Sequence, residues 1–189
     1  MTWLILGLAL FLGVHSVSIV APAWRDGRVQ RLGEKPWKGL YALVSVVGFA
    51  MLVVGYGIAR QSPVLLYAPP AWTRHLTLLL MLPVFVLLFA AYLPGRIKSA
   101  VKHPMLAAVM LWALAHLLAN GTLADVLLFG GFLVWAVADR ISLKYRVPRP
   151  VPGAPLRPVN DLIAGTGGLV VYVLFVAGLH RWLIGVSPF

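Results

Sequence analysis

Long apolar stretches alternate along the chain with short polar and basic ones. A helix needs about 20 apolar residues to cross a bilayer, and six stretches of roughly that length can be read in the sequence. These predicted spans cover residues 2–21, 40–59, 72–93, 104–119, 122–139 and 162–184. In lipid a helix satisfies its own backbone groups. The pattern therefore predicts an all-α, polytopic membrane helix bundle with about six transmembrane helices.

Individual residues near the span ends indicate where the predicted helices begin and end. No Lys or Arg precedes Arg25, so the first span lacks the basic region of a secretory signal and is expected to remain as a helix. Pro104 suits a first helical turn, and Asn120-Gly121 is typical of a turn that ends a helix. The stretch 147–159 is rich in proline and is expected to be extended.

The composition agrees with a membrane protein. Hydrophobic residues make up 61% of the 189 residues and charged residues 11%, against about 25% charged in a soluble domain. The mean hydropathy is +0.91. There is no cysteine, which excludes disulfides, thiolate metal sites and cysteine nucleophiles. No polar stretch is long enough for a separate soluble domain, so residues 1–189 are expected to form one transmembrane domain.

The basic residues predict an orientation. The chain has 16 Lys and Arg against 5 Asp and Glu, but they lie in short clusters between spans, and no nucleic-acid partner is expected. Thirteen of the 16 lie in the first, third and fifth loops. The positive-inside rule places these loops in the cytoplasm. We therefore expect a multi-pass protein of the bacterial inner membrane with both termini periplasmic, its basic loops attracted to anionic lipids.

Five histidines are the candidate chemical groups, and only two lie deep in predicted spans. By helical rise, His15 is about 19 Å and His116 about 12 Å from the outer surface. His103 lies at the cytoplasmic mouth of the fourth span, where a helix cap or a loop contact is expected. His75 and His180 lie near the outer ends of their spans and are expected to be interface side chains. A role in the cofactor site is the alternative for His103 and His180.

Two imidazoles at similar depth, one from the first and one from the fourth span, suit a haem. Zinc and di-iron sites need three or four protein ligands, and no carboxylate or thiolate lies at that depth. A porphyrin supplies four nitrogens and needs only one or two axial ligands. The alternative is that His15 and His116 make helix–helix hydrogen bonds. Neighbouring residues assigned to the same hypothetical site are Phe11 and Trp112 for ring packing, Asn120 for a hydrogen bond, and Arg74 and Arg181 for propionates. For Trp112, core packing is the competing interpretation.

Several sequence motifs resemble those of the NnrU family. They are LFLGVHS at 10–16, KGLYALVSVVGFAMLVVGYG at 38–57, HPML at 103–106, WALAHLLANGTLADVLLFGGFLVWAVAD at 112–139 and LHRWLIGVSPF at 179–189. The resemblance covers nearly the whole chain. The family takes its name from a gene linked to nitrite and nitric oxide reduction in denitrifying bacteria. Its plant relative is the zeta-carotene isomerase, a membrane protein that holds haem b.

The resemblance implies haem b with axial ligands matching His15 and His116. The plant enzyme also carries a cysteine three residues before its second ligand, proposed to exchange as a ligand. That position is Ala113 here, so a cysteine-based exchange is not implied for this chain.

Three functions follow as hypotheses, and the catalytic residues are not identified. The first is a membrane haem b protein that acts on or senses a small molecule such as nitric oxide. The second is a cis–trans isomerase of a carotenoid, a lipid-soluble ligand that enters between helices. The third is a non-enzymatic partner that assists the assembly of a respiratory reductase and needs no cofactor.

Overall fold

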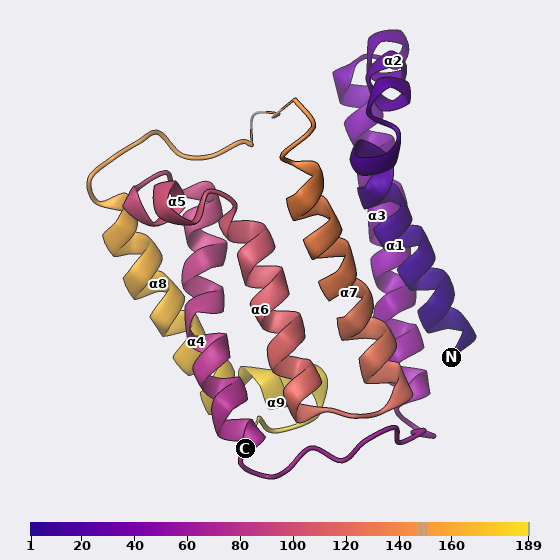
Figure 1. The fold of residues 1–189 in the computed structure, drawn as a ribbon, viewed down its shortest axis with the longest axis vertical. Helices are drawn as coiled ribbons and strands as arrows, with labels where there is room; N and C mark the ends of the chain where they lie inside the picture. The colour runs from indigo at the N-terminus through magenta and orange to yellow at the C-terminus, as the bar shows by residue number, and fades with distance from the viewer. Residues whose placement is uncertain (148, 150, 189) are drawn as a thin grey trace. The chain divides into compact units, whose positions relative to one another are not determined.

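The computed structural model describes residues 1–147, 149 and 151–188, and these form an entirely helical fold (Figure 1). Pro148, Pro150 and Phe189 lie outside the described residues, so the last residue of the LHRWLIGVSPF motif does too. The elements are α1 (Thr2–Val20), α2 (Pro22–Leu32), α3 (Glu34–Ala59), α4 (Thr73–Tyr92), α5 (Arg96–Val101), α6 (Pro104–Ala119), α7 (Leu123–Ser142), α8 (Asn160–Leu174), the π-helical turn η1 (Phe175–Leu179) and α9 (His180–Ile184).

The apolar helices lie where the hydropathy pattern predicts them. Within the described part of the chain, four are long and apolar enough to cross a membrane: α1, α3, α4 and the continuous segment Asn160–Ile184. The α6 helix is apolar but shorter, with 16 residues. The α7 helix has 20 residues and carries charged side chains near both ends. The prediction of an all-α membrane helix bundle is confirmed, and these six segments match the six predicted spans.

The structure adds helices in regions predicted as loops. The first basic loop contains α2, whose Pro22 occupies the first turn, where its missing N–H is not needed. Gly33, with φ 86°, separates α2 from α3. The α3 helix then begins at Glu34, six residues before the predicted start, and Glu34 pairs with Lys38 one turn later at 2.6 Å. Short polar helices of this kind lack the hydropathy signal that identifies spans.

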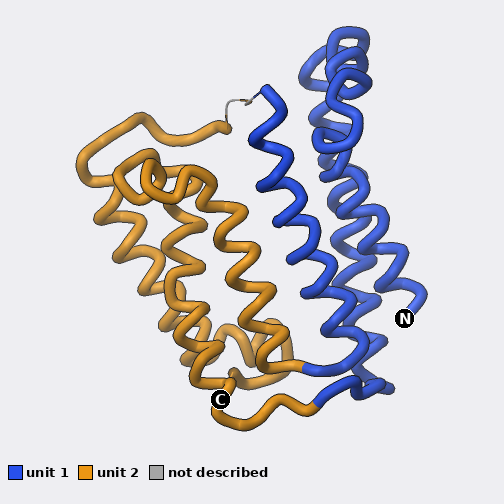
Figure 2. The backbone as a smooth tube through the Cα atoms, viewed as in Figure 1, with its two compact units in different colours: residues 1–67, 121–147 blue, residues 68–120, 148–189 orange. Residues whose placement is uncertain are grey.

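The chain divides into two compact units (Figure 2). Unit 1 contains residues 1–67 and 121–147, with α1, α2, α3 and α7. Unit 2 contains the described residues of 68–120 and 148–189, with the remaining helices. The expectation of one domain over residues 1–189 stays a prediction.

In unit 1, glycines let the backbones of α1 and α3 touch. A Cβ on Gly7 of α1 would lie 2.6 Å from the backbone nitrogen of Leu52. A Cβ on Gly55 of α3 would collide with the backbone of Leu4, which is fully buried. A Cβ on Gly48 would be similarly obstructed. Small residues at such contacts are how membrane helices gain packing energy without a hydrophobic driving force.

Unit 2 packs α4 against both α6 and α8. Val84 and Leu87 of α4 form a buried cluster with Ala108 of α6. A Cβ on Gly168 of α8 would lie 2.5 Å from the backbone nitrogen of Val86, so α8 also approaches α4 closely. The hydroxyl of Tyr172 donates to the carbonyl of Leu78 at 3.0 Å and adds a polar tie between these two helices.

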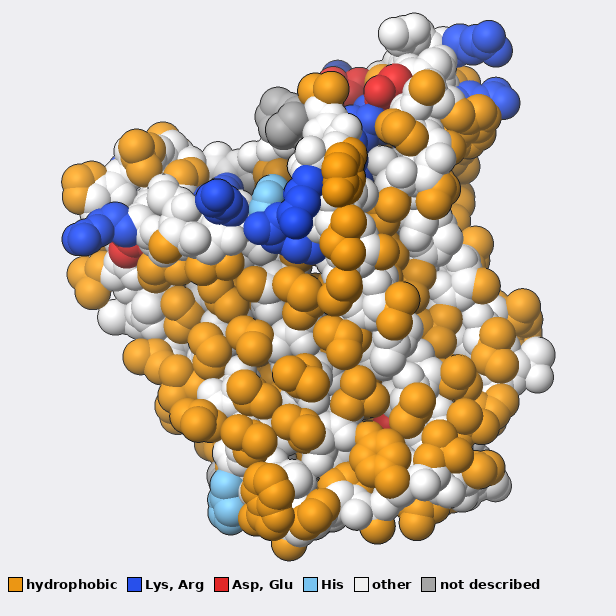
Figure 3. Space-filling view, viewed as in Figure 1, with side chains coloured by type: hydrophobic (Ala, Val, Ile, Leu, Met, Phe, Trp, Pro, Cys, Tyr) orange, Lys and Arg blue, Asp and Glu red, His pale blue; other side chains and the backbone are white. Residues whose placement is uncertain are grey.

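Apolar side chains dominate the surface along the helices. On the face seen in Figure 3, hydrophobic side chains cover much of the helix length, and Lys and Arg side chains lie toward the upper end of the view, around α2 and also around α5. Examples on one helix are Leu43, Val46 and Phe49 of α3, each more than half exposed. Exposed apolar surface of this extent is expected where helices face lipid.

We expect Gly55→Ala to destabilise the protein by about 1–3 kcal/mol, because the methyl group would overlap the backbone of α1. Gly57→Ala on the same helix is the matched control, since nothing lies within 4 Å of its Cβ position. Alanine there should be neutral or stabilising by up to about 1 kcal/mol. Thermal unfolding in detergent, followed by circular dichroism, measures both. Equal midpoints for the two variants would contradict this packing.

Candidate histidine site

His116 lies in the last turn of α6, and the helix itself fixes its protonation. The ring Nδ1 lies 2.8 Å from the carbonyl oxygen of Trp112, four residues earlier. A carbonyl can only accept, so Nδ1 carries a proton, and in the neutral imidazole Nε2 then keeps its lone pair. The Trp112 ring lies beside the imidazole, with ring centroids 5.4 Å apart. The half-buried imidazole therefore presents a ligating nitrogen in a defined tautomer.

The structure brings His180 to His116 within unit 2. Their ring centroids are 6.5 Å apart, and the ring planes differ by 24°. His180 begins α9, and its Nδ1 lies 2.7 Å from the carbonyl oxygen of Val186. It therefore has the same tautomer as His116. The sequence placed His180 near the outer end of its span but did not indicate which residue it meets.

The spacing of this pair can be compared with that of two axial ligands. Two metal–imidazole bonds of about 2 Å each, in line, put the nitrogens about 4 Å apart and the ring centres roughly 6 Å apart. The observed 6.5 Å between the centroids of His116 and His180 is close to this value. Metal-bound histidines characteristically donate their second nitrogen to a carbonyl or carboxylate, as both rings do here. Two imidazoles are the type of donor that haem iron accepts, and the centroid spacing of this nearly parallel pair is compatible with that use.

His15 lies in unit 1 in an aromatic environment. Its Nδ1 lies 2.7 Å from the carbonyl oxygen of Phe11, and its ring stacks on the Phe11 ring at 4.3 Å. The rings of Tyr41 and Trp135 approach it edge-on at 5.2 and 6.0 Å. The indole nitrogen of Trp135 is buried without a hydrogen-bond partner among the described residues. An unpaired buried donor costs free energy, so an acceptor beside it would be stabilised.

The other predicted site residues take different positions. Asn120 donates its side-chain amide to the backbone carbonyl of His116 at 2.9 Å. His103 occupies the N-cap position of α6 but makes no capping bond with its side chain. Arg74 on α4 and Arg181 on α9 are exposed. Haem contacts for all of these residues stay predictions.

His15 and His116 belong to different units. In each unit the ring Nδ1 is bonded to a backbone carbonyl oxygen, and the pairing of the two residues on one cofactor stays a prediction. Over the described residues, no three His, Asp or Glu side chains gather into a group that could hold a metal ion.

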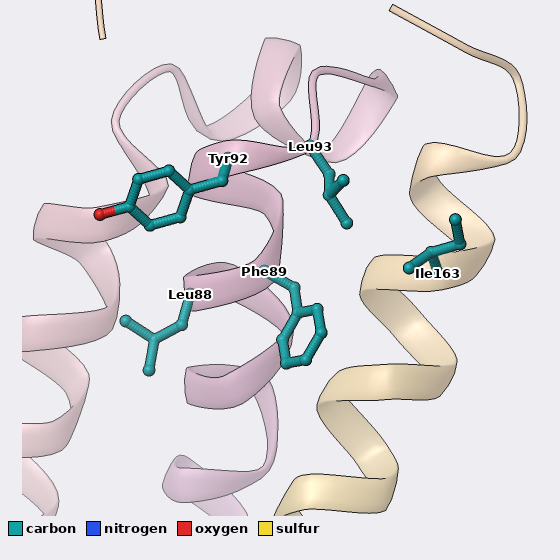
Figure 4. A pocket seen from close by; sticks show the side chains of 5 residues that line it. All are labelled: Leu88, Phe89, Tyr92, Leu93 and Ile163. Carbon is teal, nitrogen blue, oxygen red and sulfur yellow. The ribbon is translucent and has the colours of Figure 1, made fainter. Parts of the chain in front are cut away.

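Unit 2 also contains a cavity of about 460 Å³ whose lining is apolar, unlike the surroundings of the histidines. It is lined by Leu88, Phe89, Tyr92 and Leu93 of α4 and by Ile163 of α8 (Figure 4). None of these side chains is a metal ligand or an acid–base group near neutral pH. Such a lining can accommodate a hydrocarbon chain but offers no groups for catalysis.

A buried carboxylate in unit 1 has a structural role that the sequence pattern did not indicate. Asp125, 5% exposed, accepts hydrogen bonds from the backbone and hydroxyl of Thr122 in a capping box at the start of α7. The hydroxyl of Tyr56 on α3 donates to its other oxygen at 2.6 Å. The available signal was the T-x-x-D pattern before an apolar run, which is typical of a capping box. Asp125 thus ties α3 to α7.

We expect Tyr56→Phe to lower the free energy of unfolding by about 1.5–3 kcal/mol, because a hydrogen bond to a buried carboxylate is lost. Tyr145→Phe is the control, since Tyr145 is 84% exposed. The measurement is chemical unfolding of both variants in the same detergent. A Tyr56→Phe unfolding curve that superimposes on the control curve would contradict a stabilising role for the hydrogen bond between Tyr56 and Asp125.

Comparison with known proteins completes the description of the site. The family model described as "NnrU protein" matches residues 3–188 of this chain. No curated protein and no solved structure matches it.

Proposed function

Because the chain belongs to the NnrU family, we propose that it is a membrane haem b protein that takes part in nitrite and nitric oxide reduction. The observation that carries the haem assignment is the His116–His180 pair, with ring centroids 6.5 Å apart and both Nδ1 atoms bonded to carbonyl oxygens. The link to nitric oxide is an inference from the resemblance to the family. The apolar surface of the helices would admit an uncharged small molecule from the lipid.

In this proposal His116 is the first axial ligand. The carbonyl of Trp112 holds its Nδ1 proton, which orients the ring and increases the basicity of Nε2. Asn120 bonds the backbone carbonyl of His116 and steadies the last turn of α6. Haem iron, when bound, supplies a position that can take nitric oxide if one axial ligand is weak or displaceable.

Two histidines compete for the second axial position. His180 is supported by its closeness to His116 within unit 2. His15 is supported by the family resemblance, by its fixed tautomer and by the unpaired Trp135 N–H beside it. Arg74 and Arg181 are exposed cations on the helices of unit 2, and we propose them as partners of the propionates.

The carotenoid isomerase hypothesis has less support in this chain. Ala113, three residues before His116, is fully buried and offers no thiolate. A ligand exchange that depends on cysteine at this position has no residue to perform it.

We expect the purified protein, expressed with haem supplied, to show a Soret band, and His116→Ala to lower its haem content about tenfold or more. His75→Ala, which removes an exposed histidine of α4, is the matched control and should keep the haem. Oxidised and dithionite-reduced spectra measure both. Absence of a Soret band in the unaltered protein would contradict the haem assignment.

The same spectra identify the second ligand. Loss of the six-coordinate, low-spin form in His180→Ala but not in His15→Ala would assign the position to His180. The reverse result would assign it to His15.

We also propose that the protein lies in the bacterial inner membrane with the first loop cytoplasmic and both termini periplasmic, because most basic residues lie in alternate loops. The chain has no cysteine, so single cysteines can report the orientation. In intact cells a membrane-impermeant maleimide should label Gln61→Cys and leave Gln30→Cys, on α2, unlabelled. Labelling of Gln30→Cys but not of Gln61→Cys would show the opposite orientation, with the first loop periplasmic.

A further inference from the structure

A second polar site lies in unit 1, and one of its lining residues, Tyr41, also contacts the ring of His15. It is a cavity of about 220 Å³ at the junction of α1, α2 and α3. Water occupies about 30 Å³ per molecule in the liquid, so the cavity has room for a tetrahedral oxyanion and a few waters. Its lining residues are Val17 and Ser18 of α1, Arg25 of α2, and Trp37, Lys38 and Tyr41 of α3.

Each of the two cations of this cavity pairs with a neighbouring carboxylate. Arg25 pairs with Asp26 through Nη1 at 2.9 Å, and its guanidinium carbon lies 6.0 Å from the centroid of the Trp37 ring. Its side chain is only 24% exposed. Lys38 pairs with Glu34 at 2.6 Å. A guanidinium has five N–H donors and an ammonium three, so each cation keeps further donors for a ligand.

The hydroxyls of Ser18 and Tyr41, which line the cavity, are also available to bond a ligand. Serines within apolar helices satisfy their hydroxyls by donating to the carbonyl four residues earlier. Ser16 and Ser45 do so, at 2.7 and 2.8 Å. Ser18 makes no such bond, and neither its hydroxyl nor that of Tyr41 has a hydrogen-bond partner within the described part of the chain. Both residues line the cavity.

We propose that this cavity binds a phosphate group, supplied either by the headgroup of an anionic phospholipid or by free inorganic phosphate. Guanidinium, ammonium and hydroxyl donors together match the oxygens of a phosphate, with Arg25 making the strongest, charge-assisted bonds. The two acidic residues beside the cations do not cancel the local charge, because α2 and the start of α3 also carry Arg28, Arg31 and Lys35. Trp24 meets the Trp37 ring edge-on at 6.0 Å. Tryptophans of this kind mark the headgroup level of a bilayer, where lipid phosphates lie.

The test uses the full-length protein in detergent with equal amounts of phosphatidylglycerol and phosphatidylcholine, and native mass spectrometry measures the ratio of the two bound lipids. We expect the unaltered protein to enrich phosphatidylglycerol about tenfold. Arg25→Gln and Lys38→Gln should bring the ratio close to one. Ser18→Ala should lower it about threefold, the loss expected for one neutral hydrogen bond. This milder variant keeps the test valid if Arg25→Gln does not fold.

Arg28→Gln and Lys35→Gln are matched controls, because they remove the same charge from the same segment without lining the cavity. Both should keep the enrichment. A second arm compares sodium phosphate with sodium chloride at equal ionic strength. Displacement of the lipid by phosphate would assign the cavity to free phosphate, and retention would assign it to the headgroup.

Two results would overturn the proposal. One is an equal loss of enrichment in the controls and in the cavity variants, which would mean that a diffuse basic surface holds the lipid. The other is the absence of phosphatidylglycerol enrichment in the unaltered protein in sodium chloride.

Discussion

The structure depends on one constraint: along apolar helices, each polar group must find its partner on the chain itself. In hydrocarbon, no water replaces a missing hydrogen bond, and the cost of an unpaired polar group rises. Ser16, Ser45 and Thr77 donate to backbone carbonyls, and the imidazoles of His15 and His116 do the same. A helix that satisfies its polar side chains in this way can remain in lipid.

A few polar groups of unit 1 do not meet this constraint, and their positions are informative. The indole N–H of Trp135 and the hydroxyls of Ser18 and Tyr41 have no hydrogen-bond partner among the described residues. Trp135 lies beside His15, and the two hydroxyls line the cavity with Arg25 and Lys38. In unit 1, unpaired donors are therefore found beside His15 and in the basic cavity, and a ligand at either place would complete them.

Histidine is well suited to this setting because it has two nitrogens. One nitrogen satisfies the helix by donating to the carbonyl four residues earlier, and the other is left with a lone pair that has no obligatory partner. His15 and His116 each make the first of these bonds, and the Nδ1 of His180 makes a similar bond to the carbonyl of Val186. The bond that makes the imidazole acceptable in the membrane also prepares it as a ligand.

The sequence alone determined the fold class, the approximate spans and the family, because hydropathy over about 20 residues and the family motifs are properties of contiguous segments. It also identified His116 and His15 as deep polar groups, since depth follows from position along a helix. It did not predict α2, the early start of α3 or the hydrogen bond between Tyr56 and Asp125. Only the tertiary structure decided that His180 meets His116, and that Ser18, Arg25 and Lys38 surround one cavity. These residues are far apart in the chain or on different helices, and their meeting depends on helix rotation and close packing at glycines such as Gly7 and Gly55, which a hydropathy pattern does not record.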